Sequence, residues 1–431
     1  MSIRIKHVIA LIAACALASC GGGGGGGGNA KIRLLNLSTG YNSLDLITNV
    51  EADDDDDDET QASGVALETV SSYAELDPDD YTIKLKRTGS GSVLRSFTAE
   101  QLVEDTMNTY VAFGEVGQFG ALRLDDTQDE ADAGETKLSV ANLSSAGSVD
   151  VYITDPDVDL SDTTPVVSSV GAGFVSIAVD SGTFRLRVTA AGDNADVRLD
   201  VSGFSLADRG VAALIFTSTQ GGTLANALYM PQEGQPTKLL NTKSRVRAAI
   251  AVANGANASV QVAGTSVLAT ATAGVISSRY TLLPSGSQPV TLVVNGAAVA
   301  VPNVSLTAGA DYTLLVWGTA ASPQASLVID DNRLPTGVQT KLRLLNGMST
   351  LAAPLTLSLD FSPVIEGTPV GQVSDPVEVT SGTDRQFDIS NTSTAASILT
   401  RTGLSLQSAS VYTFFMTDNG ATPIGVLRRD R

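Results

Sequence analysis

Residues 137–154 read KLSVANLSSAGSVDVYIT, and this stretch decides the fold. In its second half Val149, Val151 and Ile153 alternate with three more polar residues. A period of two, entered through a loop of Asn, Ser and Gly, is typical of two β-strands joined by a turn.

The same pattern recurs three more times at a spacing of about 100 residues, which is the size of one small β-sandwich. It begins at Lys31 (KIRLLNLSTGYNSLDLIT), Arg245 (RVRAAIAVANGANASVQV) and Lys341 (KLRLLNGMSTLAAPLTLSL). The sequence therefore predicts four related domains, each stabilised by its own apolar core.

A closing strand recurs as well, as in LTAGADYTLLVW at residues 306–317 and LQSASVYTFFM at residues 406–416. A leucine six residues before a tyrosine resembles the tyrosine corner of Greek-key sandwiches, although the spacing is longer in the first segment. We expect Tyr110, Tyr312 and Tyr412 to be structural residues rather than ligand-binding ones.

Polar stretches that contain Gly or Pro separate the repeats at residues 125–136, 231–243 and 330–340, and these are predicted linkers. We expect an all-β chain of tandem immunoglobulin-like β-sandwich domains at residues 30–128, 134–233, 242–335 and 338–431. One short amphipathic helix is expected at residues 98–107, TAEQLVEDTM.

The repeat resembles an immunoglobulin-like domain of unknown function that occurs in tandem in bacterial surface lipoproteins, with first strands of the type RVVHASPDAPAVDVYV. Residues 148–152, SVDVY, match the second half of that pattern, and Asn36 or Asn142 followed later by Ser stands where His-Ala-Ser is usual. The resemblance is clearest in the first two segments. It implies an architecture and a surface location, and no activity.

The N-terminus has the features of an export signal. Arg4 and Lys6 precede an apolar run of 11 residues, which is too short to span a bilayer because a membrane helix needs about 20. Residues 17–20, LASC, resemble the lipobox of bacterial lipoprotein precursors. This resemblance implies a signal peptide at residues 1–19 and acylation of Cys20, whereas the alternative is a secreted protein with a free thiol.

Eight glycines follow Cys20, and residues 20–29 are interpreted as the lipidated cysteine with a flexible tether. Two or more acyl chains would hold the protein to a membrane almost permanently. Gly21 after the cysteine indicates export to an outer membrane or the cell surface.

Charge and composition exclude several functions. The formal net charge is −19, and it becomes −21 once Arg4 and Lys6 are removed, so nucleic acid is not an expected partner. The cluster Arg428, Arg429 and Arg431 is interpreted as a solvated segment. His7, Cys15 and Cys20 all precede the repeats, which excludes imidazole or thiolate catalysis and metal sites in the folded part.

Two acidic stretches are candidate calcium sites. Residues 51–59, EADDDDDDE, lack a turn glycine and alternate spacing, so we expect a solvated loop. A better cation pattern occurs in DPDVDLSD, but it lacks the terminal glutamate of a calcium loop. A polar loop joining two strands is the favoured interpretation, and a calcium site is the alternative. Its candidate calcium ligands are Asp155, Asp157, Asp159 and Asp162.

Two carboxylates could hydrolyse a sugar without histidine, but such a site needs a cleft with aromatic platforms. The single tryptophan, Trp317, lies in YTLLVW and is expected to be a buried strand residue. We therefore expect a noncatalytic, lipid-anchored envelope protein with a binding, adhesion or structural role and an unknown protein or glycan partner. The alternatives are a carboxylate-dependent glycoside hydrolase or a calcium-dependent carbohydrate-binding surface protein.

Overall fold

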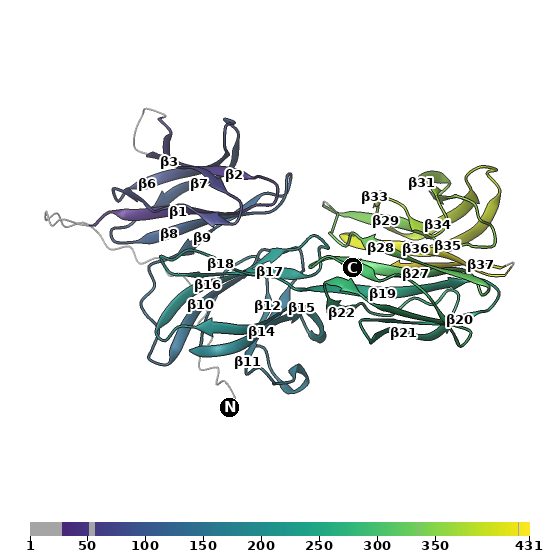
Figure 1. The fold of residues 1–431 in the computed structure, drawn as a ribbon. Helices are drawn as coiled ribbons and strands as arrows, with labels where there is room; N and C mark the ends of the chain where they lie inside the picture. Colours follow the sequence, from purple (N-terminus) through teal and green to yellow (C-terminus); the bar gives the residue numbers. More distant parts are fainter. Residues whose placement is uncertain (1–27, 51–56, 336, 421) are drawn as a thin grey trace. The chain divides into compact units, whose positions relative to one another are not determined.

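The computed structural model describes residues 28–50, 57–335, 337–420 and 422–431. Within this part, β-strands are the main regular secondary structure, and the single helical element is a short 3-10 turn. The strands form four β-sandwiches in chain order, which we term copies 1 to 4 (Figure 1). The predicted class, all-β with tandem immunoglobulin-like sandwiches, is confirmed.

Copies 1 and 2 use the first eighteen strands. Copy 1 contains β1 (Ala30–Leu37), β2 (Ser43–Val50), β3 (Glu59–Ala66), β4 (Thr69–Val70), β5 (Ala74–Leu76), β6 (Asp80–Arg87), β7 (Val93–Gln101), β8 (Met107–Phe113) and β9 (Gly120–Asp125). Copy 2 contains β10 (Glu135–Asn142), β11 (Val149–Thr154), the 3-10 turn η1 (Leu160–Asp162), β12 (Val167–Val170), β13 (Val175–Asp180), β14 (Gly182–Ala190), β15 (Asp193–Leu206), β16 (Gly210–Ser218), β17 (Ala225–Pro231) and β18 (Thr237–Leu239).

Copies 3 and 4 use the remaining strands. Copy 3 contains β19 (Lys243–Val252), β20 (Asn257–Val262), β21 (Thr265–Thr272), β22 (Thr281–Pro284), β23 (Gly286–Gln288), β24 (Val290–Val294), β25 (Ala297–Val299), β26 (Val304–Leu306), β27 (Asp311–Thr319) and β28 (Ser322–Asp330). Copy 4 contains β29 (Gln339–Asn346), β30 (Leu355–Leu359), β31 (Ser362–Thr368), β32 (Gln372–Val373), β33 (Val377–Thr380), β34 (Gly382–Asn391), β35 (Ser397–Leu406), β36 (Ser410–Asn419) and β37 (Thr422–Arg429).

The copies share a two-sheet topology, to which copy 3 adds a two-stranded sheet, β23-β26. The first sheet is built around the opening strand, which pairs in parallel with the penultimate long strand, as in β1 with β8 and β19 with β27. The second sheet has the orders β3-β2-β6-β7, β12-β11-β14-β15, β21-β20-β24-β25 and β31-β30-β34-β35. This repetition explains why the sequence pattern recurs.

The opening strands are apolar on both faces because both faces are buried. In β1, Ile32 and Leu34 point into the core of copy 1. Leu35 and Leu37 belong instead to a second cluster, whose other members come from β8, β9 and copy 2. The near-continuous apolar run of the strand thus reflects a neighbour on its outer side.

The chain divides into two compact units, and each unit is a pair of sandwiches. Unit 1 holds copies 1 and 2, and unit 2 holds copies 3 and 4 together with residues 218–225. Within each unit the two first sheets pack face to face. In unit 2 this contact contains Ala249, Ala251, Leu315, Leu345 and Phe415.

Two sequence predictions about local structure are wrong. Residues 98–107 form no helix, because residues up to Gln101 belong to β7 and pair with β6, and Ala99 has a φ of 52°. The stretch 231–243 is more than a linker, because it contains β18, which pairs with β17. In both places sheet pairing overrides the local pattern.

The described residues contain no helix that is long and apolar enough to cross a bilayer.

Candidate functional site

Deeply buried charged groups form one arrangement that recurs in three of the four copies. In copy 1 Arg33 Nε donates to Thr109 Oγ1 at 2.7 Å, and Arg33 Nη2 lies 3.0 Å from Asp126 Oδ2. Thr109 in turn donates to the Asp126 carboxylate. We term this set an Arg–Thr–Asp triad. It lies on the outer face of the first sheet, where copy 1 meets copy 2.

The register of the parallel strands repeats the triad in copies 3 and 4. Each arginine lies opposite its threonine, as Arg33 lies opposite Thr109. The further triads are Arg247, Thr313 and Asp330 in copy 3, and Arg343, Thr413 and Asp430 in copy 4.

Copy 2 lacks the triad. Its register places Ser139 opposite Ala213, and Gln232 takes the position of the aspartate. Arg33 of copy 1 therefore meets an uncharged partner surface, and its Nη1 donates to the Gly234 carbonyl at 3.0 Å. The hairpin of β17 and β18 supplies this acceptor.

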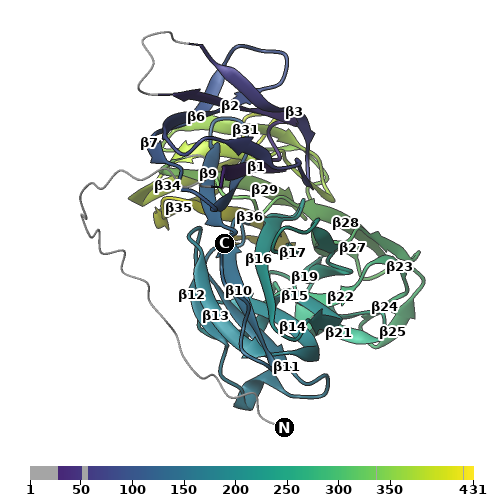
Figure 2. The same cartoon turned by 90° about the vertical axis from the view of Figure 1, so that its left-hand side faces the viewer.

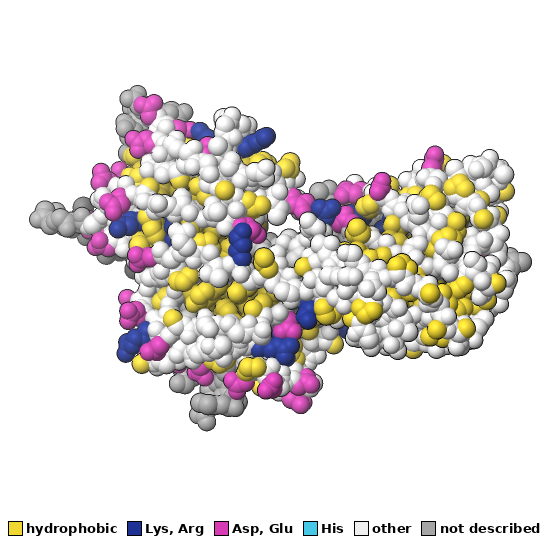
Figure 3. Space-filling view, in the orientation of Figure 1, with side chains coloured by type: hydrophobic (Ala, Val, Ile, Leu, Met, Phe, Trp, Pro, Cys, Tyr) yellow, Lys and Arg dark blue, Asp and Glu magenta, His cyan; other side chains and the backbone are white. Residues whose placement is uncertain are grey.

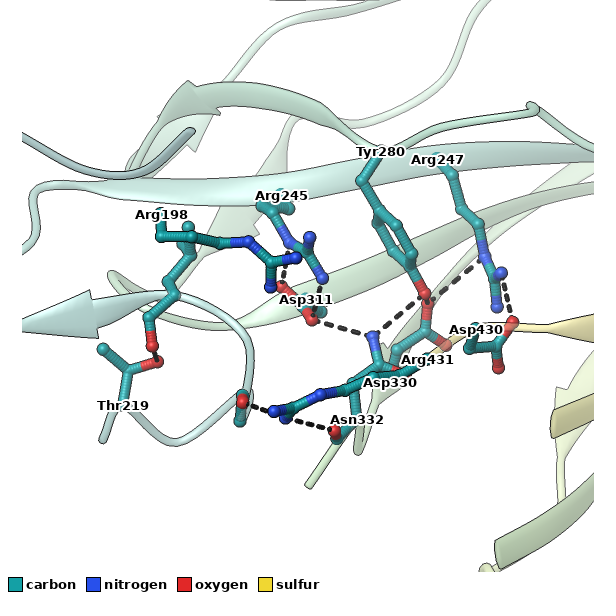
Figure 4. Close-up of polar contacts among 12 residues, drawn as sticks. Arg198, Thr219, Arg245, Arg247, Tyr280, Asp311, Asp330, Asn332, Asp430 and Arg431 are labelled. Atoms are coloured by element: carbon teal, nitrogen blue, oxygen red, sulfur yellow. Dashed lines mark hydrogen bonds and ion pairs between the residues drawn. The ribbon is translucent and has the colours of Figure 1, made fainter. Parts of the chain in front are cut away.

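In unit 2 the two triads face each other. Figure 4 shows Arg247 of copy 3 beside Asp430 of copy 4. Arg343 Nη2 lies 3.0 Å from Asp430 and 3.2 Å from Asp330. Arg247 contacts Asp430 through Nη1 and lies 3.5 Å from Asp330 through Nε. Each carboxylate is therefore shared by the arginines of both copies. The arrangement locks the two sandwiches together.

A tyrosine extends both networks. Tyr280 donates to Asp330 at 2.8 Å, and the Arg247 guanidinium lies 4.7 Å from its ring centroid. Tyr73 repeats this in copy 1, where it donates to Asp126 at 2.7 Å. Such ring stacking on a desolvated guanidinium adds to the attraction of the ion pair.

Charge in this network is fixed. Burial alone would raise the pKa of Asp430, but the Arg247 and Arg343 guanidinium groups hold that pKa below its usual value. Burial raises the pKa of Tyr280 well above its usual value. A glycoside hydrolase needs one carboxyl whose pKa is raised, so that it can donate a proton. Asp430 does not provide this.

Trp317 belongs to the same interface. Its side chain is partly buried among the residues that join copies 3 and 4, and Nε1 donates to Ser326 Oγ at 2.9 Å. Gly371 packs against the indole, where an added Cβ would lie 2.5 Å from the ring. The expectation that Trp317 is a strand residue of the core, rather than a sugar platform, agrees with this packing.

The candidate calcium ligands lie on the connection between β11 and β12. Asp157, Asp159 and Asp162 are exposed, and Asp159 Oδ1 accepts from the Ser161 backbone N–H at 2.9 Å, which lowers its pKa. Asp155 is half-buried. Within the described residues no three acidic, histidine or cysteine side chains gather as an ion site would require.

Hydrogen bonds to its backbone carbonyls hold this connection against copy 2. The carbonyls of Pro156, Val158 and Leu160 accept hydrogen bonds from side chains of β14 and β15. Arg187 Nη2 donates to Val158 at 2.7 Å, and Asn194 Nδ2 donates to Leu160 at 2.9 Å. Because the carbonyls turn toward the sheet, the connection lies over the outer face of copy 2 as a strap of residues 155–166.

The acidic run 51–59 occupies the same position in copy 1, between β2 and β3. Residues 51–56 lie outside the described part of the chain. Asp58 is not free in solvent, because Lys84 Nζ lies 2.6 Å from its Oδ1 and Lys86 contacts its other oxygen. In copies 3 and 4 the same connection is a two-residue turn. This connection is therefore where the copies differ most.

Acidic charge is segregated between the units. Residues 28–240 contain 13 Lys and Arg against 35 Asp and Glu, whereas residues 241–431 contain 12 against 11. Figure 3 shows the acidic side chains gathered over copies 1 and 2, with few over copies 3 and 4 on that face. The net acidic charge of the chain thus lies in unit 1.

The tyrosine corner forms in two of the three copies, and all three tyrosines are buried, as expected of structural residues. The backbone N–H of Thr307 donates to Tyr312 Oη at 3.0 Å, and that of Gln407 donates to Tyr412 Oη at 3.3 Å. Tyr110 is not equivalent, because it lies opposite Leu34, two positions further along the opening strand. It packs against Phe97 instead, with ring centroids 5.1 Å apart.

Asn36 and Asn142, singled out in the sequence, bridge the two sheets of their copies. Asn36 Nδ2 donates to the Val65 and Tyr41 carbonyls, and its Oδ1 accepts from the Ser38 backbone. Asn346 makes the same three contacts in copy 4. These asparagines are structural.

Two further sequence predictions concern the N-terminal segment and the arginine cluster. The signal at residues 1–19, Cys20 and most of the glycine tether lie outside the described residues. The prediction that the arginine cluster is solvated is wrong for two members. Arg428 donates to the Ser277 carbonyl, and Arg431 donates to the Asn332 carbonyl.

A shallow depression of about 430 Å³ lies on copy 1, lined by residues 61–66 and 69–73. It opens between the edges of the two sheets. Its polar side chains already have partners, as in Ser63 Oγ with Asp45 and Tyr73 Oη with Asp126. It offers a surface for weak binding and no catalytic group.

Fold and contacts together define a chain of paired, immunoglobulin-like sandwich domains. The family model described as a domain of unknown function, DUF4397, matches residues 30–152 and 244–353. These ranges hold more than half of the chain, which therefore belongs to this family. Each match covers one copy and the first strands of the next, beginning at copies 1 and 3 rather than at the first two segments.

No curated protein matches the chain. Among solved structures, a carbohydrate-binding module of family CBM26 from Eubacterium rectale Amy13K, solved in complex with maltoheptaose, is 12% identical. The similarity covers 44% of this chain and 92% of that one, with a TM-score of 0.16. A score this low carries no argument about fold or ligand.

Proposed function

We propose that this chain is an exported, noncatalytic protein of the cell envelope, held to a membrane by lipid on Cys20. It presents two rigid sandwich pairs for binding, adhesion or a structural role. One observation carries the proposal. Buried arginines and aspartates of the described residues join the paired sandwiches, as the shared contacts of Arg343 with Asp330 and Asp430 illustrate.

Rigid pairing suits a display protein. A joint between domains of one chain is mobile unless the interface is large and apolar. Here an apolar cluster and a buried ion network reinforce each other in unit 2. The second sheets and their variable connections are then held at fixed positions within each pair. Several weak contacts on such a frame can sum to useful avidity.

The N-terminal segment and the family support the proposed location at the cell envelope. The lipobox-like LASC and the glycine tether support an anchor at the outer membrane or the cell surface. A strongly acidic unit 1 would be repelled by anionic headgroups and would keep the pair clear of the bilayer. The partner is a protein or a glycan of the envelope or its surroundings.

Lipid attachment is tested by metabolic labelling with a fatty-acid analogue in a bacterial host. Wild type and Cys15→Ala should incorporate label, whereas Cys20→Ala should not. Cys15 is the matched control because it is a cysteine in the apolar run that precedes Cys20. Equal labelling of all three proteins would reject the anchor.

Binding is tested with residues 28–431, which contain every described strand, against envelope extracts and immobilised neutral and acidic glycans, with and without calcium. Retention of a defined partner without chemical change supports the proposal. Time-dependent release of reducing sugar from any glycan would overturn the noncatalytic assignment. Retention that requires calcium would support the aspartates of the strap as calcium ligands.

A further inference from the structure

Copy 3 has an edge strand without the usual protection against pairing. β21, Thr265–Thr272, has the sequence TSVLATAT, without a charged residue or a proline. It is the outermost strand of the sheet β21-β20-β24-β25, and it is labelled in Figure 2. Most of its residues are exposed. Such an edge presents backbone N–H and C=O groups to a partner strand. One of them is occupied, because the Val267 carbonyl accepts from Ser277 Oγ at 2.9 Å.

The other long edges of this chain are guarded. Among the described sheet-edge strands of eight or more residues, β21 alone has neither a charged residue nor a proline. Charge and proline are the means by which natural sheets prevent edge pairing. Guard residues on the remaining long edges are Glu59 (β3), Arg95 (β7), Asp196 (β15), Pro323 (β28), Arg401 (β35) and Pro423 (β37).

The strands at the position of β21 in the other three copies each have a feature that hinders pairing. In copy 1, β3 directly follows the acidic run. In copy 2, β12 has four residues, and the Ser169 N–H is already bound by Asp150. In copy 4, β31 contains Pro363 and Glu366. Register shifts in the pairing occur at β3, β21 and β31 alike and do not distinguish them.

The surroundings of β21 are also uncharged. Residues 248–310 contain one Asp, Glu, Lys or Arg, which is Arg279. Two copies of an acidic chain repel each other over most of their length, but not here. Antiparallel pairing of β21 with itself would place no like charges side by side.

We propose that β21 pairs antiparallel with β21 of a second copy of this chain, so that two four-stranded sheets become one continuous sheet. Association stops at a dimer because the equivalent edges of copies 1, 2 and 4 are guarded. This inference is independent of the lipid anchor, although anchoring to a membrane would raise the local concentration and favour the dimer.

Sedimentation analysis of residues 28–431 over a wide concentration range tests the proposal. We expect a monomer–dimer equilibrium whose Kd rises at least tenfold in Ala269→Lys and in Thr270→Lys, both exposed on β21. Thr291→Lys is the matched control, because it adds the same charge on β24, in the middle of the sheet. It should leave the Kd unchanged.

Every other outcome overturns the proposal. A wild-type monomer at all concentrations excludes self-pairing and leaves the edge to a different partner. Loss of the dimer in Thr291→Lys alone shows contact through the sheet face. Single cysteines at Ser266, Ala269, Thr270 and Thr272 provide a second measurement, since residues 28–431 contain no cysteine. Oxidative cross-linking should peak at one position; uniform cross-linking contradicts a fixed register.

Discussion

Removing Arg343 tests the central claim about the interface of unit 2. This side chain is 1% exposed, and it contacts Thr413, Asp430 and Asp330. Replacement by serine, the residue of copy 2, leaves two buried carboxylates short of a cation. Breaking a buried pair on one side costs about 3–5 kcal/mol.

The single tryptophan makes this loss measurable. Trp317 lies in the interface between copies 3 and 4, so its fluorescence reports on unit 2. With a urea m-value of roughly 2–3 kcal/mol/M, the expected loss lowers the unfolding midpoint by about 1–2 M. Arg401→Ser, on an exposed part of β35, is the control and should change stability by less than about 0.5 kcal/mol.

The uncharged residues that copy 2 has at the triad positions allow a stricter test. In Arg343→Ser/Thr413→Ala/Asp430→Gln, copy 4 has the residues that copy 2 has at these positions. Arg247 and Asp330 then remain paired opposite a neutral surface, as Arg33 and Asp126 are in unit 1. We expect the triple variant to be more stable than Arg343→Ser, because fewer buried charges are unpaired. If it is less stable, or if Arg343→Ser behaves like the control, the argument from the triads is refuted.

Three further predictions concern the strap, acid sensitivity and the asparagine bridges. Arg187→Met removes the hydrogen bonds to Thr154 and Val158 and should increase cleavage of residues 155–166 by an aspartate-specific protease severalfold. Burial would raise the pKa of Asp331, but Arg333 and Lys341 lower it to about 2, so its contribution to unit 2 stability is complete above about pH 4 and is lost as pH falls toward 2. Asp331→Asn should flatten the pH dependence of the Trp317 midpoint in that window. Asn346→Ala leaves three backbone groups without their partner and should cost about 2–3 kcal/mol in the same urea assay.

Each of these has a result that would contradict it. Cleavage of the strap at the wild-type rate, with exposed Arg209→Met as control, would mean that Arg187 does not hold it. An unchanged pH profile in Asp331→Asn would remove this carboxylate from the acid response. A loss below about 0.5 kcal/mol in Asn346→Ala would show that water replaces the bridge.

Part of the candidate site was visible in the sequence. Arg33, Arg247 and Arg343 interrupt apolar opening strands at the same offset, and a charge inside a strand buried on both faces indicates a partner. The partner itself was not predictable. Arg33 and Thr109 are 76 positions apart, and Thr109 and Asp126 are 17 apart. Likewise, the spacing of Asp155 to Asp162 resembled a cation loop, but the carbonyls of that segment were committed to β14 and β15.

The sequence by itself determined the repeat, the strand periodicity and the absence of histidine and cysteine from residues 28–431, because these are local or compositional properties. Only the tertiary structure decided that copies pair as 1 with 2 and 3 with 4, and that three arginines find their carboxylates there. Side-chain alternation is set residue by residue along the backbone. Which distant faces meet is set by the register of parallel strands and by the burial of apolar surface.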